Sequence, residues 1–179
     1  MKEPLEEAEF LNRARSGEPF AITQLYERYG DMVYGIGYRL TGSTMDAEDV
    51  LQDVFLGLPR ALQTYAGRGS LKGWIKRVAA RTTLMKLRVR KRKAEVTLDH
   101  LPPGPTDWGG SGSSPTDRME LEDAVDALPE RLRSVFILRD IEGYGHSEIG
   151  EMLGIGTGAS RVRLHRARRI LRKHLEKSR

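Results

Sequence analysis

Apolar residues recur every three or four positions over much of the chain, which is the spacing of one face of an α-helix. From Pro19 to about Leu40 this pattern predicts a long helix with a core-facing stripe of Ile22, Tyr26, Tyr29, Val33, Ile36 and Leu40. A shorter helix is expected over residues 3–15. After Thr41-Gly42-Ser43 the pattern restarts, with Ser43 or Thr44 as the expected N-terminal cap. The helix that follows is expected to bury Val50, Leu51, Val54, Phe55 and Leu58.

A third long helix is predicted over residues 71–93, after a glycine-rich loop that ends in Ser70, its expected cap. Its outer face is strongly basic, and its inner face carries Leu71, Trp74, Ile75, Val78, Ala79 and Leu84. Residues 94–118 are rich in Pro, Gly, Ser and Thr, a composition typical of a flexible linker. The predicted fold class is therefore all-α, with two small helical domains joined by this linker.

Two helices are expected directly after the linker. The first is patterned by Met119, Leu121, Val125 and Leu128. Pro129 is expected at the first position of the second helix, where its missing N–H costs nothing. The apolar stripe of that second helix is Leu132, Val135, Phe136, Leu138 and Ile141.

Residues 139–173 predict a helix-turn-helix. A short helix runs into Gly154, and a longer one follows with Thr157 as its expected cap. The inward stripe of the longer helix is Ser160, Leu164, Ala167, Leu171 and Leu175. Its other faces carry Arg161, Arg163, Arg166, Arg168, Arg169, Arg172 and Lys173. A basic second helix after a glycine turn is typical of units that read DNA, whereas the alternative interpretation is a plain solvated face.

Composition narrows the function classes. The chain has no cysteine, which excludes disulfides, thiolate zinc sites and a cysteine nucleophile. No apolar run approaches membrane-spanning length, so we expect no membrane insertion. The first ten residues are acidic and do not resemble a signal peptide, which favours a cytoplasmic protein.

Charge is strongly segregated along the chain. Residues 54–93 hold twelve basic and no acidic residues, and residues 161–179 hold nine basic and one acidic. The flanking segments are acidic, with eleven acidic and five basic residues over 1–53 and thirteen against four over 94–160. Two basic blocks suggest two contacts along one polyanion, and nucleic acid is favoured over a membrane surface. Tyr65 and Trp74, beside the first block, are candidates for stacking on unpaired bases, with core packing as the alternative.

Asp46, Asp49 and Asp53 fall on one flank of a predicted helix. Their spacing alone favours a solvated face; metal ligation, acid–base catalysis and an acidic docking surface are the functional alternatives. No histidine or phosphate-cradling glycine motif accompanies them, and in the charge pattern they lie away from the basic surfaces. An enzyme is therefore disfavoured.

Three segments together resemble the bacterial extracytoplasmic-function (group 4) sigma factors. They are DAEDVLQDVFL, GSLKGWIKRVAARTTL and LPERLRSVFILRDIEGYGHSEIGEMLGIGTGASRVRLHRARRIL, and the resemblance covers about residues 16–92 and 119–176. It implies an N-terminal tail over 1–15, sigma domain 2 over 16–93, a linker over 94–118 and sigma domain 4 over 119–179. It also implies a protein without catalytic activity or cofactor, which binds core RNA polymerase at its clamp coiled coil and flap and directs it to promoters. An anti-sigma factor is expected as a further partner.

The resemblance assigns expected roles to individual residues. Docking on the clamp coiled coil is expected of Asp46, Glu48, Asp49, Gln52, Asp53 and Leu56. Capture and melting of the −10 element are expected of Tyr65, Arg68, Ser70, Trp74, Lys76, Arg77, Arg81 and Arg88. In duplex −35 recognition, Arg161, His165 and Arg166 match base-reading positions and Arg139 and His146 match backbone contacts, with Thr157 and Val162 on the same surface.

The chain departs from the family at several of these positions. Arg81 stands where an asparagine is usual in the family, and the family usually has an aspartate near the position of Met85. Serine is common at the position of Val162, and a β-branched apolar residue at that of Ser160. The promoter sequence is therefore not carried over from relatives. The competing hypothesis is a stand-alone helix-turn-helix regulator that binds duplex operator DNA as a dimer, although no heptad run suggests a dimerisation helix.

Overall fold

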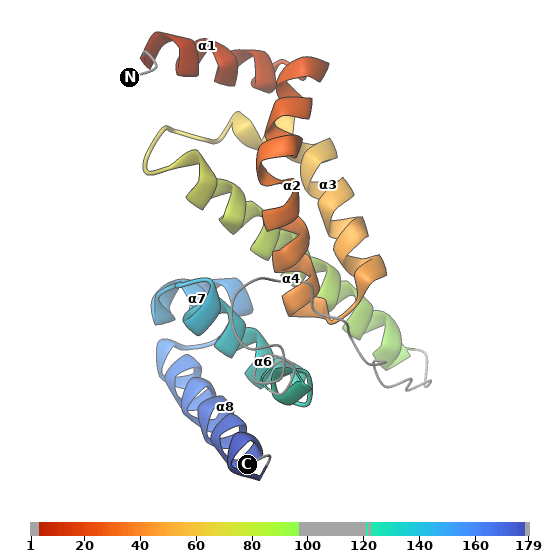
Figure 1. Cartoon of the computed structure of the whole chain (residues 1–179), viewed down its shortest axis with the longest axis vertical. Helices are drawn as coiled ribbons and strands as arrows, with labels where there is room; N and C mark the ends of the chain where they lie inside the picture. The colour runs from red at the N-terminus through yellow and green to blue at the C-terminus, as the bar shows by residue number, and fades with distance from the viewer. Residues whose placement is uncertain (1–3, 97–120, 122, 178–179) are drawn as a thin grey trace. The chain divides into compact units, whose positions relative to one another are not determined.

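The computed structural model describes residues 4–96, 121 and 123–177. Over these residues the regular elements are all helical (Figure 1). The chain divides into two compact units, Met1–His100 and Leu101–Arg179, which confirms the predicted all-α, two-domain class.

The first unit contains four helices: α1 (Pro4–Arg15), α2 (Pro19–Thr41), α3 (Thr44–Leu62) and α4 (Leu71–Val96). Helix α2 packs against both α3 and α4, which also contact each other, and α1 crosses α2 and α3 (Figure 1). The core is aliphatic, and its fully buried side chains include Leu25, Val33, Ile36, Leu40, Val50, Leu58, Leu62 and Ile75. Tyr26 departs from the predicted stripe, being 47% exposed while Leu25 is buried, because its ring packs at the rim, edge-on to Phe55.

The α2–α3 turn is fixed by local hydrogen bonds. Gly42 adopts a left-handed conformation (φ 69°) and donates its N–H to the Tyr38 carbonyl, which ends α2. Ser43 caps α3 as expected, its hydroxyl accepting from the Asp46 N–H at 3.2 Å. Gly37 allows α2 and α3 to approach closely, since a Cβ there would lie 3.2 Å from the Ala47 Cα. These bonds hold the start of α3 firmly against α2.

Arg15 joins α1 to the far end of α3. Its guanidinium donates to the carbonyl oxygens of Leu62 and Tyr65 at 3.1 and 2.9 Å. Carbonyls at a helix C-terminus lack intrahelical donors, so a cation there is favourable. Ala14, the preceding residue, is fully buried.

Helix α4 begins after Ser70, whose hydroxyl accepts from the Gly73 N–H at 3.1 Å. It continues to Val96, three residues beyond its predicted end and into the expected linker. Residues 97–118, the rest of that linker, lie outside the described residues, as does Met119.

The second unit has helical residues at 121 and 123–126, then α6 (Glu130–Phe136), η1 (Ile137–Ile141), α7 (His146–Leu153) and α8 (Thr157–Lys177). Pro129 precedes α6 rather than opening it: its carbonyl accepts from the N–H groups of Leu132 and Arg133. The predicted position was thus wrong by one residue. Leu121, expected in an apolar stripe, is 42% exposed.

The segment η1 is a π-helix, with a wide turn closed by the Glu142 N–H on the Ile137 carbonyl at 2.9 Å. Such a turn holds one residue more than an α-turn and rotates the side chains after it. Ile141, predicted on the core stripe, is consequently 43% exposed, whereas Ile137 is fully buried. The 3.6-residue period used for the prediction fails at this turn.

Helices α7 and α8 form the predicted helix-turn-helix. Gly154 ends α7 in a left-handed conformation (φ 66°), and the Ile155 N–H donates to the Gly150 carbonyl. The inward stripe of α8 is confirmed at Ser160, Leu164, Ala167 and Leu171, which are at most 5% exposed, whereas its last predicted member, Leu175, is only half-buried. Thr157 is the first residue of α8 and not its cap, since the Gly156 carbonyl accepts from the Ser160 N–H.

Candidate docking and nucleic-acid surfaces

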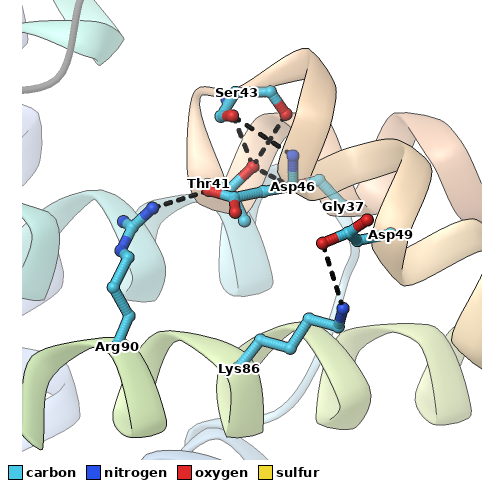
Figure 2. A network of polar contacts seen from close by, with 7 residues as sticks. All are labelled: Gly37, Thr41, Ser43, Asp46, Asp49, Lys86 and Arg90. Atoms are coloured by element: carbon cyan, nitrogen blue, oxygen red, sulfur yellow. Dashed lines mark hydrogen bonds and ion pairs between the residues drawn. The ribbon is translucent and has the colours of Figure 1, made fainter. Parts of the chain in front are cut away.

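The three aspartates on the flank of α3 face α4. Arg90 Nη1 lies 2.6 Å from Asp46 Oδ2, and Lys86 Nζ lies 3.6 Å from Asp49 (Figure 2). Lys86 Nζ also lies 2.8 Å from Asp53. The pairs run in opposite directions along the two helices, so α3 and α4 are antiparallel here. The expectation that these aspartates lie away from the basic surfaces was therefore wrong. Net charge per segment does not reveal which helices pack together.

These contacts weaken the metal-site and catalytic interpretations of the flank. Two cationic side chains occupy the side from which the aspartates would approach a metal ion. Over the described residues, no group of three or more His, Asp or Glu side chains is placed to hold one. Partial burial on its own lowers the pKa of Lys86, but Asp53 and then Asp49 outweigh it, and the pKa of Lys86 is raised. Lys86 thus stays charged against the flank at neutral pH.

The open side of α3 carries a different set of residues. Glu48, Gln52 and Leu56 are exposed at steps of four, and Met45 extends the row by one turn. Met45 is 70% and Leu56 74% exposed, so this row of α3 offers two large apolar side chains to a partner. Met45 was missed from the sequence, although its spacing from Glu48 places it on the same face. We call Met45, Glu48, Gln52 and Leu56 the α3 face.

Tyr65 supports the loop before α4. The side chain is only 7% exposed, and its hydroxyl donates to the Gly69 carbonyl at 3.0 Å. The expectation that Tyr65 offers its ring to unpaired bases is therefore wrong for this conformation. Trp74 lies 5.3 Å from the Tyr65 ring, centroid to centroid, and is half-buried, so part of its indole stays accessible. Arg68 and Ser70 of the loop are exposed, and Ser70 also caps α4.

A basic stripe, which we call the α4 stripe, runs along the outside of α4. Its members recur at steps of three and four and are all exposed: Arg77, Arg81, Met85, Arg88 and Arg92. Lys76, beside the stripe, is half-buried. Met85 is 62% exposed and Val89 47%, so the stripe also offers apolar contact area that charge counting missed. Lys86 and Arg90 do not belong to it, because they point to α3.

Helix α8 presents a reading face near its N-terminus. Arg161, Val162, His165 and Arg166 are exposed and one turn apart in pairs. Thr157 is exposed at the first position of the same helix. Backbone N–H groups at a helix start favour phosphate, and arginine pairs with guanine edges, so this face suits duplex DNA.

Arg139 and His146, expected as backbone contacts, both have partners inside the protein. Arg139 Nη1 donates to the Tyr144 carbonyl at 2.9 Å. His146 Nδ1 shares a hydrogen bond with the buried Ser160 hydroxyl at 2.9 Å. Burial lowers the pKa of His146, and the positive charges of Arg139, Arg161 and Arg168 act in the same direction, with Asp140 opposing them. Both residues are half-buried and connect elements of the helix-turn-helix.

Arg168 has a partner in η1, although its side chain is exposed. Its guanidinium donates from Nε and Nη2 to the two carboxylate oxygens of Asp140 at 2.9 and 2.6 Å. The hydrogen bonds that Arg168 donates to Asp140, and the negative charge of that carboxylate, raise the pKa of Arg168. No local pattern predicts this pair, because its members lie 28 positions apart. None of the described helices is both long and apolar enough to span a lipid bilayer.

Both units correspond to known families. Residues 25–93 match Sigma-70 region 2, and residues 118–171 match Sigma-70, region 4. The chain is 34% identical over 161 residues to the ECF RNA polymerase sigma factor SigE of Mycolicibacterium smegmatis, covering 86% of this chain but 61% of that protein. It is 30% identical over 165 residues to the RNA polymerase sigma factor CarQ of Myxococcus xanthus, covering 92% of this chain and 95% of CarQ.

Solved structures agree at the level of the fold. The sigma factor RpoE of Bartonella quintana, solved with the anti-sigma factor NepR, has a TM-score of 0.67 at 19% identity over 88% of this chain and 98% of that one. CnrH, solved with the cytosolic domain of CnrY, has a TM-score of 0.57 at 23% identity, with coverage of 95% and 97%. The two regions in order, the near full-length match to the sigma factor CarQ and the likeness to the ECF sigma factor SigE place the protein: the chain belongs to the extracytoplasmic-function RNA polymerase sigma factors.

Proposed function

We propose that this chain acts in the cytoplasm as a group 4 sigma factor, which binds core RNA polymerase and starts transcription at promoters with defined −10 and −35 elements. The observation that carries the proposal is that regions 2 and 4 occur in one chain and each exposes a basic helical face, the α4 stripe in one and the α8 reading face in the other. Two such faces suit two separate stretches of one DNA molecule.

The α3 face is the proposed contact with the clamp coiled coil of core polymerase. Exposed large apolar residues among polar ones are typical of interface centres, and Met45 and Leu56 flank Glu48 and Gln52 in this way. Asp46, Asp49 and Asp53 lie at the edge of this face, where pairing with α4 fixes their positions. Their proposed role is to border the contact with negative charge.

The loop before α4 and the α4 stripe are the proposed −10 surface. Trp74 offers the accessible part of its indole to an unpaired base, and Arg68 and Ser70 lie in the loop beside it. Arg77, Arg81 and Arg88 hold phosphates along the exposed side of α4. Tyr65 keeps the loop in place from beneath, through its bond to the Gly69 carbonyl.

The α8 reading face is the proposed −35 surface. Its arginines, Arg161 and Arg166, reach base edges in the major groove, with Val162 and His165 between them. Thr157, at the helix start, lies where a phosphate would approach. Arg139 and His146 are proposed to brace this helix, and their remaining donor capacity serves the DNA backbone.

An anti-sigma factor and the polymerase flap are proposed as further partners. Two solved structures of the same fold contain a second protein, the anti-sigma factor NepR in one case and the cytosolic domain of CnrY in the other. The α3 face and the α8 reading face are the exposed surfaces that such a partner would cover.

Reconstituted transcription tests the proposal. Core polymerase freed of other sigma factors, with a fragmented genomic library as template, should produce transcripts with common start sites only when this chain is added. Mapping those starts identifies both promoter elements. The competing regulator hypothesis predicts the opposite behaviour: tight binding to duplex DNA by the chain alone, and no new start sites with core polymerase.

A further inference from the structure

The pair formed by Asp140 and Arg168 occupies an unusual place, between the wide turn of η1 and the middle of α8. Arg168 belongs to the run of arginines on α8 and, by sequence, counts as one more phosphate contact. In the structure both of its bonds run to Asp140 instead. We propose that the Asp140–Arg168 pair is a positioning device that sets the orientation of α8, and with it the sharpness of −35 discrimination, without touching DNA. This inference rests on the proposed function of α8.

The geometry of the pair suits a directional restraint. A two-pronged guanidinium–carboxylate contact fixes the relative rotation of its partners, whereas apolar contacts are not directional. The residues of α8 beside Arg168 that face the core are Leu164, Ala167 and Leu171. Ala167 is small and fully buried, so the packing at the centre of the contact lacks a large interlocking side chain. The polar pair supplies the missing directionality.

Two further polar links close a triangle around this pair. Arg139, next to Asp140 in η1, donates to the carbonyl of Tyr144, in the loop that leads into α7. His146, at the start of α7, is bonded to Ser160 in the first turn of α8. The segment η1 is thus joined to α8 directly and through α7. Wide π-turns occur often at functional sites, and this one places Arg139 and Asp140 so that they hold both helices of the reading unit.

A small rotation of α8 is enough to matter. Side-chain ends lie about 5–6 Å from a helix axis, so a rotation of about 20° displaces them by about 2 Å. That displacement breaks a hydrogen bond of normal length, and each two-pronged arginine–guanine contact is worth about 1–3 kcal/mol of discrimination. The ion pair itself contributes little to folding, because the Arg168 side chain is 55% exposed. We therefore expect the loss of the Asp140–Arg168 pair to reduce discrimination of the −35 element more than it reduces folding stability.

Charge-preserving substitution separates this role from a phosphate contact. Arg168→Lys keeps the positive charge but cannot make the two-pronged bond. Asp140→Asn keeps the shape but removes the charge that holds Arg168. If Arg168 contacted phosphate, the first variant would behave like the wild type, and the second would bind all DNA more tightly because a nearby negative charge is gone. Arg172→Lys, one turn further along α8, is the matched control.

The experiment measures holoenzyme binding to two duplexes, one with the −35 element mapped in the transcription assay and one with that element scrambled. We expect Arg168→Lys and Asp140→Asn each to lower the ratio of the two affinities about three- to tenfold, a fraction of one lost base contact. In both variants, the affinity for the scrambled duplex and the thermal midpoint should stay close to those of the wild type. In Arg168→Lys, the salt dependence of that affinity should also be unchanged. Arg172→Lys should leave the ratio unchanged, and Asp140→Glu should restore most of it.

The double variant, Arg168→Lys with Asp140→Asn, is an internal check. If the two residues act through one pair, the double variant should lower the affinity ratio no more than the more severe single variant does. Additive losses, an unchanged ratio in both single variants, or tighter binding of both duplexes by Asp140→Asn would each overturn the role of the pair. A wild-type holoenzyme that does not distinguish the two duplexes would instead contradict the proposed function of α8.

Discussion

Arg90 on α4 holds Asp46 on α3 at 2.6 Å, although 44 positions separate the two residues in the sequence. Asp46 also donates its N–H to the Ser43 cap, and the Ser43 backbone is bonded to Thr41 at the end of α2 (Figure 2). The start of α3 is therefore linked to α4 through Asp46 and to α2 through Ser43. The Arg90 side chain is 51% exposed, and water screens the attraction. We expect Arg90→Met to lower the unfolding free energy of the first unit by about 0.2–1 kcal/mol, measured by urea titration with Trp74 fluorescence.

Arg92→Met, two residues further along and exposed, is the control for this prediction and should leave the titration midpoint unchanged. Equal losses in both variants would show that the Arg90–Asp46 contact adds nothing beyond general charge.

Leu56 on the α3 face should matter for polymerase binding and little for folding. The side chain is 74% exposed, so Leu56→Glu removes almost no core contact. If the α3 face docks on core polymerase, a charge buried at the Leu56 end of the contact should weaken the complex about tenfold or more, as measured by fluorescence anisotropy of the labelled chain. Phe20→Glu, an equally drastic change at a 64% exposed residue of α2, should have little effect. Comparable losses from both would remove the assignment of the face.

Replacing Arg166 or Arg81 by alanine should impair promoter binding in two different ways. Arg166→Ala is expected to lose about 1–3 kcal/mol of discrimination between the mapped −35 element and scrambled sequence, because base edges are no longer paired. Arg81→Ala should weaken binding to all promoters alike and reduce the slope of log affinity against log salt by about one unit. Footprinting over a salt series checks both. Equal loss across scrambled promoters for Arg166→Ala would contradict its role as a base reader.

His146 should make the second unit less stable in mild acid. Its pKa is lowered in the folded chain, so between that value and the ordinary 6.5 the unfolded chain binds more protons than the folded one. Stability therefore falls as pH drops below 6.5 and levels off below the folded pKa. His146→Gln should remove this part of the pH dependence, seen as a flatter curve of thermal midpoint against pH. A variant curve that parallels the wild type would contradict the prediction.

Gly150 should tolerate no side chain. A Cβ there would lie 2.7 Å from the Ile155 carbonyl oxygen, so the α7–α8 turn would have to move. We expect Gly150→Ala to cost about 1–3 kcal/mol in the second unit, more than the gain in helix propensity returns. Gly57 in α3 has open space at its Cβ, and Gly57→Ala should stabilise the first unit by about 0.5–1 kcal/mol. Circular dichroism melts of both variants test the contrast, and a Gly150→Ala melt like the wild type would refute it.

Periodicity and cap residues were sufficient to predict the helices and most of the core. The stripe of α8, the caps at Ser43 and Ser70 and the break at Gly154 follow from local rules, and the structure confirms them. Where the pattern failed, the 3.6-residue period did not describe the packing. Ile141 left the core because η1 adds a residue to one turn, and Tyr26 lies at the rim, where its ring packs edge-on to Phe55 of α3.

The site was harder to predict than the fold, because charge patterns do not show partners. Asp46, Asp49 and Asp53 looked like one open acidic surface, and Arg168 like one more exposed cation. Each is paired with a residue at least 28 positions away, and only the packed helices bring those partners together. Once these pairs are known, exposed apolar side chains such as Met45 and Met85 can be recognised as contact area for a partner.

The ion pairs between α3 and α4 also affect how many salt ions are released when this region binds DNA. Asp46, Asp49 and Asp53 serve as built-in counterions for Lys86 and Arg90, so those two cations displace no potassium or sodium from DNA. The twelve basic residues of 54–93 therefore overstate the effective valence of the region. The number of ions released when it engages a promoter should fall below the number that its composition suggests.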